Sequence, residues 1–433
     1  MEPLALLALA VFLGVYALTT AKILNKGLAA MAGAGLIWIA ILGFSPSASL
    51  GLPWLKIDWN AVLVLPAMAV FASLLQKTGV AQYLAIRFAK LVHGSPRGLL
   101  ALGSVAVFVL SFLIGTPAAL TLFLPVTFLI TAEMSVPLAP FLTAQVVFAA
   151  TGGLLSPIGG IAPLLISSGL GINYTSYFLT MLPFAAAATL ALLVVFPLFW
   201  GKRLHVTNER KARVLDFDET RSLQAPRVLV TTLAALGVVT VLFFLSGWLS
   251  LGLAVPAWLG AAVLLLLTQK ESGLAPETAE NAFPLFLIGI LLVVQGLAQT
   301  GLTARWGAWL AQTGSTAGAS WAILGVSGLV SAFLDNVPWA TAAVPVFQAA
   351  FKSLHHARWA DPQSLRLWVP FVVGSTLGAG ATLWGMASSL ALLGPRKNGV
   401  SISAGAFART GLLVLTVQLL AVGLLLMCLY PAR

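Results

Sequence analysis

The segment "SAFLDNVPWATAAVP", Ser331 to Pro345, contains one acidic residue, Asp335, within a long apolar part of the chain. A carboxylate at the middle of a bilayer costs about 2.5 to 3.5 kcal/mol on insertion scales, so it needs a polar partner or a water-filled cavity. The other acidic residues fall in loops or near the ends of apolar runs. Asp335 is therefore either a binding residue or, in the structural alternative, only the N-cap of the helix that follows it.

The composition around this segment is that of a polytopic membrane protein. Of the 433 residues, 60% are hydrophobic and only 8% are charged, and the mean hydropathy is +1.01. Apolar runs recur along the chain, and a run of about 17 to 25 residues is long enough to cross roughly 30 Å of hydrocarbon as a helix. These runs lack the period-two alternation of a β-barrel. The first of them, residues 3–19, is interpreted as a retained span and not as a signal peptide.

Two apolar runs, 99–132 and 318–351, are too long for a single span. Polar or helix-breaking residues interrupt both: Gly115 and Pro117 in the first, and Asp335, Asn336 and Pro338 in the second. Each run is predicted to form a re-entrant hairpin. Glycine-rich segments near 138–170 and 367–392 predict discontinuous helices, because glycine permits local unwinding. The expected fold is an all-α polytopic membrane protein with about ten full spans, two re-entrant hairpins and discontinuous helices.

The distribution of basic residues predicts the orientation. With the N-terminus outside, 17 of the 23 Lys and Arg residues lie on the inside, Lys26 among them, so both termini are expected to be extracytoplasmic in a multi-pass cell (inner or plasma) membrane protein. The formal net charge of +11 is thereby a topology signal, and no nucleic-acid partner is expected. The polar stretch 201–227 is predicted to be a cytoplasmic linker.

The linker divides two similar halves, 1–200 and 228–433. Three motifs recur in the same order: Thr78-Gly79 as Thr300-Gly301 (offset 222), Ser111, Thr121 and Pro125 as Ser331, Thr341 and Pro345 (offset 220), and Gly152 and Gly159 as Gly378 and Gly385 (offset 226). Each half contributes five crossings, an odd number, so the second is predicted to be inverted relative to the first. Inverted repeats with broken helices are typical of secondary transporters, whose substrate site lies near the midplane.

The hairpin tips and broken helices hold the candidate site residues. Helix N-termini at the tips favour anions without any basic side chain, and none is expected in a deep segment. Carbonyl and Ser, Thr and Asn oxygens favour hard cations such as Na⁺. The predicted substrate-binding residues are Ser111, Gly115, Thr116, Ser156, Gly159, Asn336, Thr382, Gly385 and Ser389. The predicted coupling-ion residues are Ser331, Asp335, Asn336, Thr382 and Ser388. Close helix packing is the alternative role of the glycines.

Other functions find little support in the sequence. The single cysteine, Cys428, excludes an intramolecular disulfide. An enzyme would need a cluster of acids, a metal motif or a Ser/His pair near one interface, and none is visible. No enzymatic activity is expected, and no cofactor or metal beyond a bound Na⁺ at Asp335. Amphipathic segments at 80–94 and 302–314 are predicted to lie in the membrane interface.

The "SAFLDNVP" motif, the hairpin around it, the glycine-rich broken helix and the duplication resemble the ion transporter superfamily. This group includes arsenite permeases, citrate and divalent-anion symporters and NhaD-type sodium/proton antiporters. The resemblance covers nearly the whole chain. It implies a scaffold, a transport domain of hairpins and broken helices, a homodimer, and an elevator movement.

The sequence departs from this family at two places. Relatives often carry an Asp-Asn type pair in both hairpins, whereas Gly115-Thr116 stands here where Asp335-Asn336 stands in the second half. Many relatives also carry an Asn after each broken helix, and the corresponding positions are Pro163 and Ser389. A coupling ion that needs a carboxylate is therefore expected to use Asp335.

Two functions follow from these observations. The first is transport of a small anion or oxyacid, such as an inorganic oxyanion or a carboxylate, coupled to Na⁺ or H⁺. The alternative is Na⁺/H⁺ antiport, in which Asp335 would carry the two cations in turn.

Overall fold

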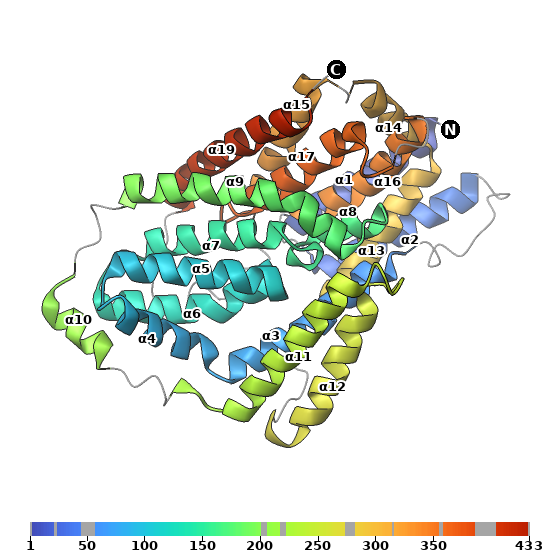
Figure 1. The fold of residues 1–433 in the computed structure, drawn as a ribbon. Coiled ribbons are helices and arrows are strands. Elements are labelled where there is room, and N and C mark those ends of the chain that lie inside the picture. The colour runs from blue at the N-terminus through green and yellow to red at the C-terminus, as the bar shows by residue number, and fades with distance from the viewer. Residues whose placement is uncertain are drawn as a thin grey trace.

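The computed structural model describes residues 2–20, 24–44, 57–200, 206–216, 222–272, 282–313, 316–354, 358–385 and 404–431. Every regular element in these ranges is a helix, which confirms the all-α prediction (Figure 1).

The helices before the linker are α1 (Glu2–Thr20), α2 (Lys26–Phe44), α3 (Trp59–Lys77), α4 (Val80–Leu91), α5 (Pro96–Ile114), α6 (Thr116–Met134), α7 (Leu138–Leu154), the 3₁₀ helix η2 (Pro157–Gly159), α8 (Ile161–Gly169) and α9 (Tyr174–Trp200). Within the linker lies α10 (Asn208–Leu215). After it come α11 (Pro226–Leu245), α12 (Ala254–Ser272), α13 (Ala282–Gln299), α14 (Leu302–Thr313), α15 (Ala317–Phe333), α16 (Asn336–Ser353), α17 (Pro362–Ala379) and α19 (Ala404–Leu429).

Length and composition make seven of the described helices able to cross a membrane, or eight if the bent pair α13 and α14 counts as one span. This pair bends by 77° between Gln299 and Leu302. Four shorter apolar helices accompany them: Pro3–Thr19, Leu138–Leu154, Ala254–Thr268 and Ala317–Phe333. The protein is therefore a multi-pass membrane protein, while the finer prediction of about ten spans and two re-entrant hairpins stays a prediction.

Both predicted helix breaks are present. Gly115, with a φ of 91°, separates α5 from α6, and these two helices lie side by side (Figure 1). Such a φ is rare for residues with a Cβ, so glycine lets the chain reverse there within one residue. Leu334 and Asp335 separate α15 from α16.

The two breaks are followed by matching helix contacts. A Cβ on Gly152 of α7 would lie 2.2 Å from the carbonyl oxygen of Phe108 on α5. A Cβ on Gly378 of α17 would lie 2.2 Å from the carbonyl oxygen of Gly328 on α15. Gly378 follows Gly152 by 226 residues and Gly328 follows Phe108 by 220, which are offsets already found in the sequence. Both Gly152 and Gly378 allow two helices to touch through their backbones.

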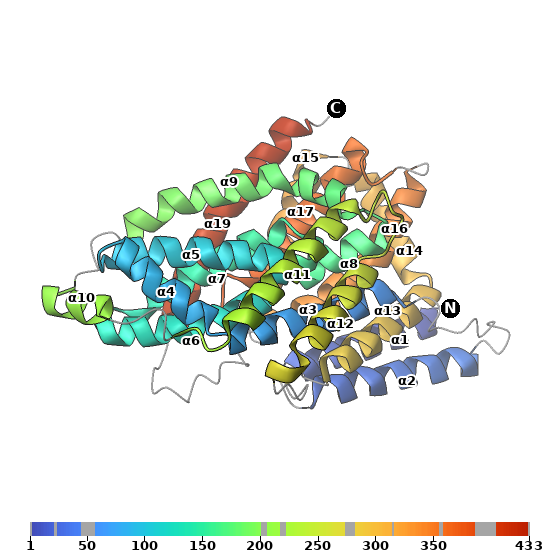
Figure 2. The ribbon, with the colours of Figure 1, turned by 60° about the horizontal axis from the view of Figure 1, so that its bottom comes forward.

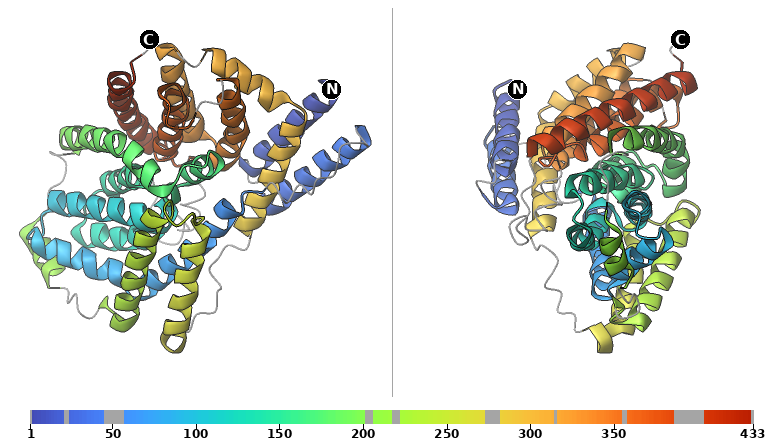
Figure 3. Two further views of the ribbon diagram at one scale, coloured as in Figure 1. Left: turned by 45° about the vertical axis from the view of Figure 1, so that its right-hand side comes forward. Right: turned by 90° about the vertical axis from the view of Figure 1, so that its left-hand side faces the viewer.

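Helices of the two halves also pack against each other. Figures 2 and 3 show α1 and α2 at one edge of the molecule beside α13, and the indole of Trp38 donates to the carbonyl of Leu292 over 3.2 Å. On the other side of α13, α16 rests on α8, where the Gln348 side chain donates to the Gly169 carbonyl over 2.6 Å. Val344 of α16 packs against the same glycine. Helices of the N-terminal half are thus packed against both α13 and α16.

We predict that Gly152→Ala and Gly378→Ala each destabilise the protein by about 1 to 3 kcal/mol, because the new methyl group meets a backbone carbonyl that has no room to retreat. Thermal unfolding in detergent measures the effect. The matched control is Gly237→Ala on α11, where an added Cβ meets nothing within 4 Å and alanine is the better helix former. Equal stability of all three variants would show that the close approach is dispensable.

Candidate functional site

The turn between α5 and α6, called the first tip below, holds a compact group of hydroxyls around one carbonyl. The turn between α15 and α16 is called the second tip. The hydroxyl oxygens of Ser111 and Thr116 lie 2.7 Å apart. Both hydroxyls are within hydrogen-bonding distance of the Ala149 carbonyl, at 2.6 and 3.2 Å respectively. The two hydroxyls flank Gly115, so they join the turn between α5 and α6 to the middle of α7.

Glycines let the broken helix approach this tip. A Cβ on Gly153 would lie 2.3 Å from the Thr116 hydroxyl oxygen, and a Cβ on Gly159 would lie 2.0 Å from the Gly153 carbonyl oxygen. The structure thus brings together four predicted residues, Ser111, Gly115, Thr116 and Gly159. Gly153 was not among the predicted residues, although the Gly152-Gly153 pair is a signal of close packing in the sequence.

The second tip repeats the contacts to one carbonyl, with serine again at the first position and asparagine in place of threonine at the second. The Ser331 hydroxyl donates to the Ser375 carbonyl over 2.6 Å, and the Asn336 amide group lies 3.5 Å from the same oxygen. Ser331 and Asn336 follow Ser111 and Thr116 by 220 residues, and Ser375 follows Ala149 by 226. The hydrogen-bonding pattern therefore recurs at the offsets of the sequence motifs.

Thr382 fixes the chain after α17 against this tip. Its hydroxyl donates to the Ala332 carbonyl and accepts from the backbone N–H groups of Trp384 and Gly385, each over 3.2 Å. A Cβ on Gly385 would lie 2.6 Å from the Ser331 carbonyl oxygen. The predicted residues Ser331, Asn336, Thr382 and Gly385 are thus neighbours. Ser388 and Ser389 lie outside the described residues.

Three oxygen atoms near the second tip make no hydrogen bond within the described part of the chain. They are the side-chain oxygens Asn336 Oδ1, Ser375 Oγ and Thr376 Oγ1, and all three are buried. A buried polar atom without a partner is unfavourable. Amide and hydroxyl oxygens are also the ligands that hard cations prefer, so this group is chemically suited to a small cation or to a polar group of a solute.

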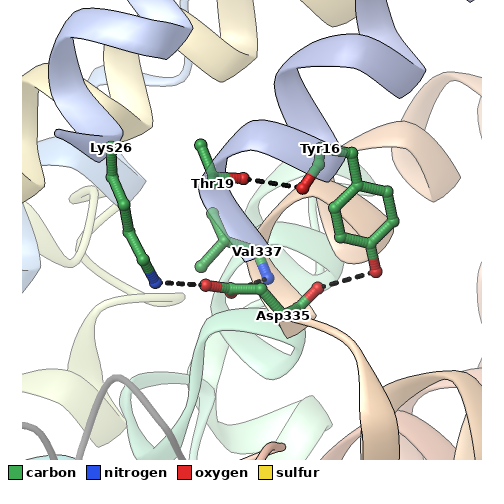
Figure 4. A network of polar contacts seen from close by, with 5 residues as sticks. All are labelled: Tyr16, Thr19, Lys26, Asp335 and Val337. Carbon is green, nitrogen blue, oxygen red and sulfur yellow. Dashed lines mark hydrogen bonds and ion pairs between the residues drawn. The ribbon is translucent and has the colours of Figure 1, made fainter. Parts of the chain in front are cut away.

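Asp335 points toward α1 and α2 (Figure 4). Its Oδ1 accepts from the backbone N–H of Val337 over 3.0 Å, and its Oδ2 lies 2.5 Å from Nζ of Lys26. The Tyr16 hydroxyl donates to the Asp335 backbone carbonyl over 3.0 Å. The carboxylate is thus both the N-cap of α16 and one half of an ion pair, so capping is only part of its role.

The ion pair adds a basic residue that the sequence analysis did not place at the tips. Lys26 was counted as a loop residue, but it is the first residue of α2, and the packing of α2 on α13 brings its side chain to Asp335. The ammonium group also lies 5.7 Å from the ring centroid of Phe286 on α13. The two partners are 309 residues apart, so no local pattern predicts the pair.

Ser156 takes a different position from the other predicted residues. It is fully buried, and its hydroxyl oxygen lies 3.1 Å from that of Tyr174 at the start of α9. The Tyr174 ring in turn stacks on Phe243 of α11. The Ser156 hydroxyl is thus directed toward α9 and not toward Thr116.

Comparison with known proteins identifies the family of this chain. The family described as citrate transporter matches residues 15–368, a range that includes Lys26, both tips and Asp335. This chain belongs to the citrate transporter family. As a member of it, the chain is a secondary transporter and not an enzyme.

Several relatives match over almost the whole transporter. A 46 kDa membrane protein of Mycobacterium leprae is 27% identical over 430 residues, which is 98% of each chain. An uncharacterised transporter of Mycobacterium tuberculosis is 26% identical over 96% of each chain. The P protein of Homo sapiens is 23% identical over 95% of this transporter, which corresponds to 58% of the P protein.

We predict that Ser111→Ala and Ser331→Ala destabilise the transporter by similar amounts, about 1 to 3 kcal/mol each, because each leaves a buried carbonyl with a weaker partner. Thermal unfolding in detergent provides the measurement. The control is Ser353→Ala, which removes an exposed hydroxyl that bonds only within its own helix. If Ser111→Ala and Ser331→Ala unfold at the same temperature as Ser353→Ala, the proposed equivalence of Ser111 and Ser331 is wrong.

Proposed function

We propose that this transporter moves a small carboxylate or inorganic oxyanion across the cell membrane, coupled to Na⁺ or H⁺. The observation that carries the proposal is that the two tips share one contact pattern but differ in charge. The first tip is uncharged and the second carries Asp335. We infer that the anion binds at the first tip and the coupling cation at the second.

The first tip suits an anion. No side chain caps the N-terminus of α6, since its N-cap is Gly115, and the hydroxyl of Thr116 lies beside it. Unpaired N–H groups and the partial positive charge of a helix N-terminus favour an anion. The N-terminus of α16 differs, because the Asp335 carboxylate already occupies its cap. Membership of a family described as citrate transporter supports a carboxylate as the first substrate class to test.

The second tip suits a cation. Asp335 supplies a negative charge, and Asn336, Ser331 and Thr382 supply neutral oxygens at the same tip. The unpaired Oδ1 of Asn336 and Oγ of Ser375 lie next to the Ser331 contact. Na⁺ binds such sets of oxygen ligands. A proton on Asp335 would serve the same purpose by neutralising the charge.

The wider architecture is also part of the proposal. We infer that 1–200 and 228–433 are inverted repeats joined by 201–227, which the recurring glycine and hydroxyl contacts support. With the N-terminus outside, Lys26 lies at the cytoplasmic end of α2, so the second tip would face the cytoplasm here. Resemblance to elevator transporters supports a homodimer whose hairpins move relative to α1 and α2.

Gradient-driven uptake into proteoliposomes tests the proposal. Radiolabelled citrate, sulfate and arsenite are offered one at a time under an imposed Na⁺ or pH gradient. We predict uptake of at least one anion with one of the two gradients, and at least a tenfold lower rate for Asp335→Asn. Asparagine is as good an N-cap as aspartate, so this change removes the charge and keeps the helix. Full gradient-driven uptake by the variant would exclude Asp335 from coupling.

Na⁺/H⁺ antiport is the second candidate function. The position of an acidic side chain, Asp335, at a tip with unpaired neutral oxygens favours it. A pH-sensitive dye inside the same vesicles distinguishes the two functions. If a Na⁺ gradient alone moves protons with no anion present, antiport replaces anion symport as the function.

We predict that Gly115→Ala weakens anion transport and leaves its dependence on the coupling cation unchanged. A methyl group at a φ of 91° and a ψ of 153°, a conformation almost confined to glycine, strains the turn by about 1 to 3 kcal/mol and lies 3.0 Å from the Ile158 carbonyl oxygen. Anion KM and the cation dependence of uptake are the measurements. Gly171→Ala is the matched control, because its φ is also positive, at 67°, and nothing lies within 4 Å. An equal change in KM for both variants would argue against a site at the first tip.

A further inference from the structure

We propose that Lys26 is a coupling residue whose ammonium group occupies the cation position at Asp335 in the unloaded transporter. The coupling cation must then displace Lys26 in order to bind. The inference rests on the proposed role of Asp335 as the ligand of the coupling cation. It adds a residue from α2 that competes for that ligand.

The geometry leaves one carboxylate oxygen for a cation, and Lys26 holds it. Asp335 Oδ1 is engaged by the Val337 N–H at 3.0 Å, whereas Oδ2 faces the Lys26 ammonium at 2.5 Å. The two side chains are 8% and 29% exposed respectively. A second cation on Oδ2 would stand next to the ammonium in a partly buried setting, where like charges repel strongly. Lys26 and a bound cation therefore exclude one another.

The location of Lys26 opposes the local preference of its helix. A basic residue in the first turn of a helix meets the positive end of the helix dipole, which disfavours it. Asp335 stands at the N-cap of α16, where the same effect favours its negative charge. The contact with Asp335 and the face of Phe286 compensate for the unfavourable position of Lys26. Such a conflict between local and tertiary preference is typical of functional positions.

The ion pair between Lys26 and Asp335 also joins α2 to the second tip, two parts of the chain that move relative to each other in the proposed mechanism. Tyr16 and Lys26 belong to α1 and α2, and both bind Asp335 at the tip of the second hairpin (Figure 4). While Lys26 holds the carboxylate, the tip is tied to α1 and α2. A cation that replaces Lys26 releases the stronger of these two contacts, so the hairpin becomes free to move only when it is loaded.

The reactivity of the Lys26 amine tests the competition without any transported anion. The purified full-length protein is acetylated briefly with an N-hydroxysuccinimide ester, and modification of Lys26 is quantified by mass spectrometry. Lys352, which is exposed near the end of α16, is the internal reference. One series replaces choline by Na⁺ at constant ionic strength and pH. A second series varies pH and compares wild type with Asp335→Asn at each value, so that the intrinsic chemistry of the amine cancels.

Tyr16 and Lys26 are the titratable groups that contact Asp335 within the described part of the chain, from α1 and α2. Without Na⁺ at alkaline pH, we expect Lys26 to react at least threefold more slowly than Lys352 in the wild type, and Asp335→Asn to abolish this protection. Either Na⁺ or a lower pH is expected to remove the protection in the wild type only. Loss of protection in the Na⁺ series identifies Na⁺ as the coupling cation, and loss of protection in the pH series identifies H⁺.

Two outcomes overturn the inference. The first is equal reactivity of Lys26 in the wild type and in Asp335→Asn under all conditions. The second is protection that responds neither to Na⁺ nor to pH. No anion is present in this experiment, so an error in the proposed substrate class does not affect its result. If anion uptake is driven by a cation but the reactivity of Lys26 does not respond to that cation, only this inference is wrong and the proposed function stands. Asp335→Ser, which also provides an N-cap, replaces Asp335→Asn if the latter does not fold.

Transport by Lys26 variants provides an independent readout. Lys26→Met keeps an unbranched side chain that is only one atom shorter and removes the competing charge, so the cation concentration for half-maximal uptake is expected to fall three- to tenfold. Lys26→Arg keeps the charge and is expected to remain near the wild-type value. A fall of the same size in both variants would indicate a packing effect and would contradict competition by charge.

Discussion

A carboxylate deep in a membrane protein has to be compensated, and the two oxygens of Asp335 show how this transporter does so. One oxygen accepts a backbone N–H at the start of α16, and the other pairs with Lys26 of α2. The first contact is local and fixes where the helix begins. The second joins residues that are 309 positions apart and links α2 to the start of α16. A single side chain thus serves both a helix end and a contact between distant parts of the chain.

Much of the fold could be predicted because its determinants are local. Gly115 and Asp335 interrupt apolar runs, and the helices break at those places. The glycines at 152 and 378 repeat in the sequence because each one admits a backbone carbonyl of a neighbouring helix. The partner of Asp335 could not be predicted in this way. Lys26 looks like any basic residue at the edge of an apolar run, and only the packing of α2 against α13 makes it a partner.

The comparison of the two tips separates what the repeats share from what they do not. Hydroxyl groups of Ser111 and Ser331 bind carbonyls at equivalent places, so the frame of the two tips is common. The residues that follow differ, with Gly115 and Thr116 in one and Asp335 and Asn336 in the other. The shared frame therefore presents a neutral helix terminus at one tip and a charged one at the other, as the proposed binding of an anion and a cation requires.

The contact between α8 and α16 has a consequence for movement. The Gln348 amide bonds to the Gly169 carbonyl, and Val344 fills the space left by the missing Cβ of that glycine. The second hairpin is thereby fastened to the broken helix that supports the first tip. If α16 moves during transport, this contact would make α8 move with it. The proposed occupants of the two tips would then cross the membrane in a single step, and not one after the other.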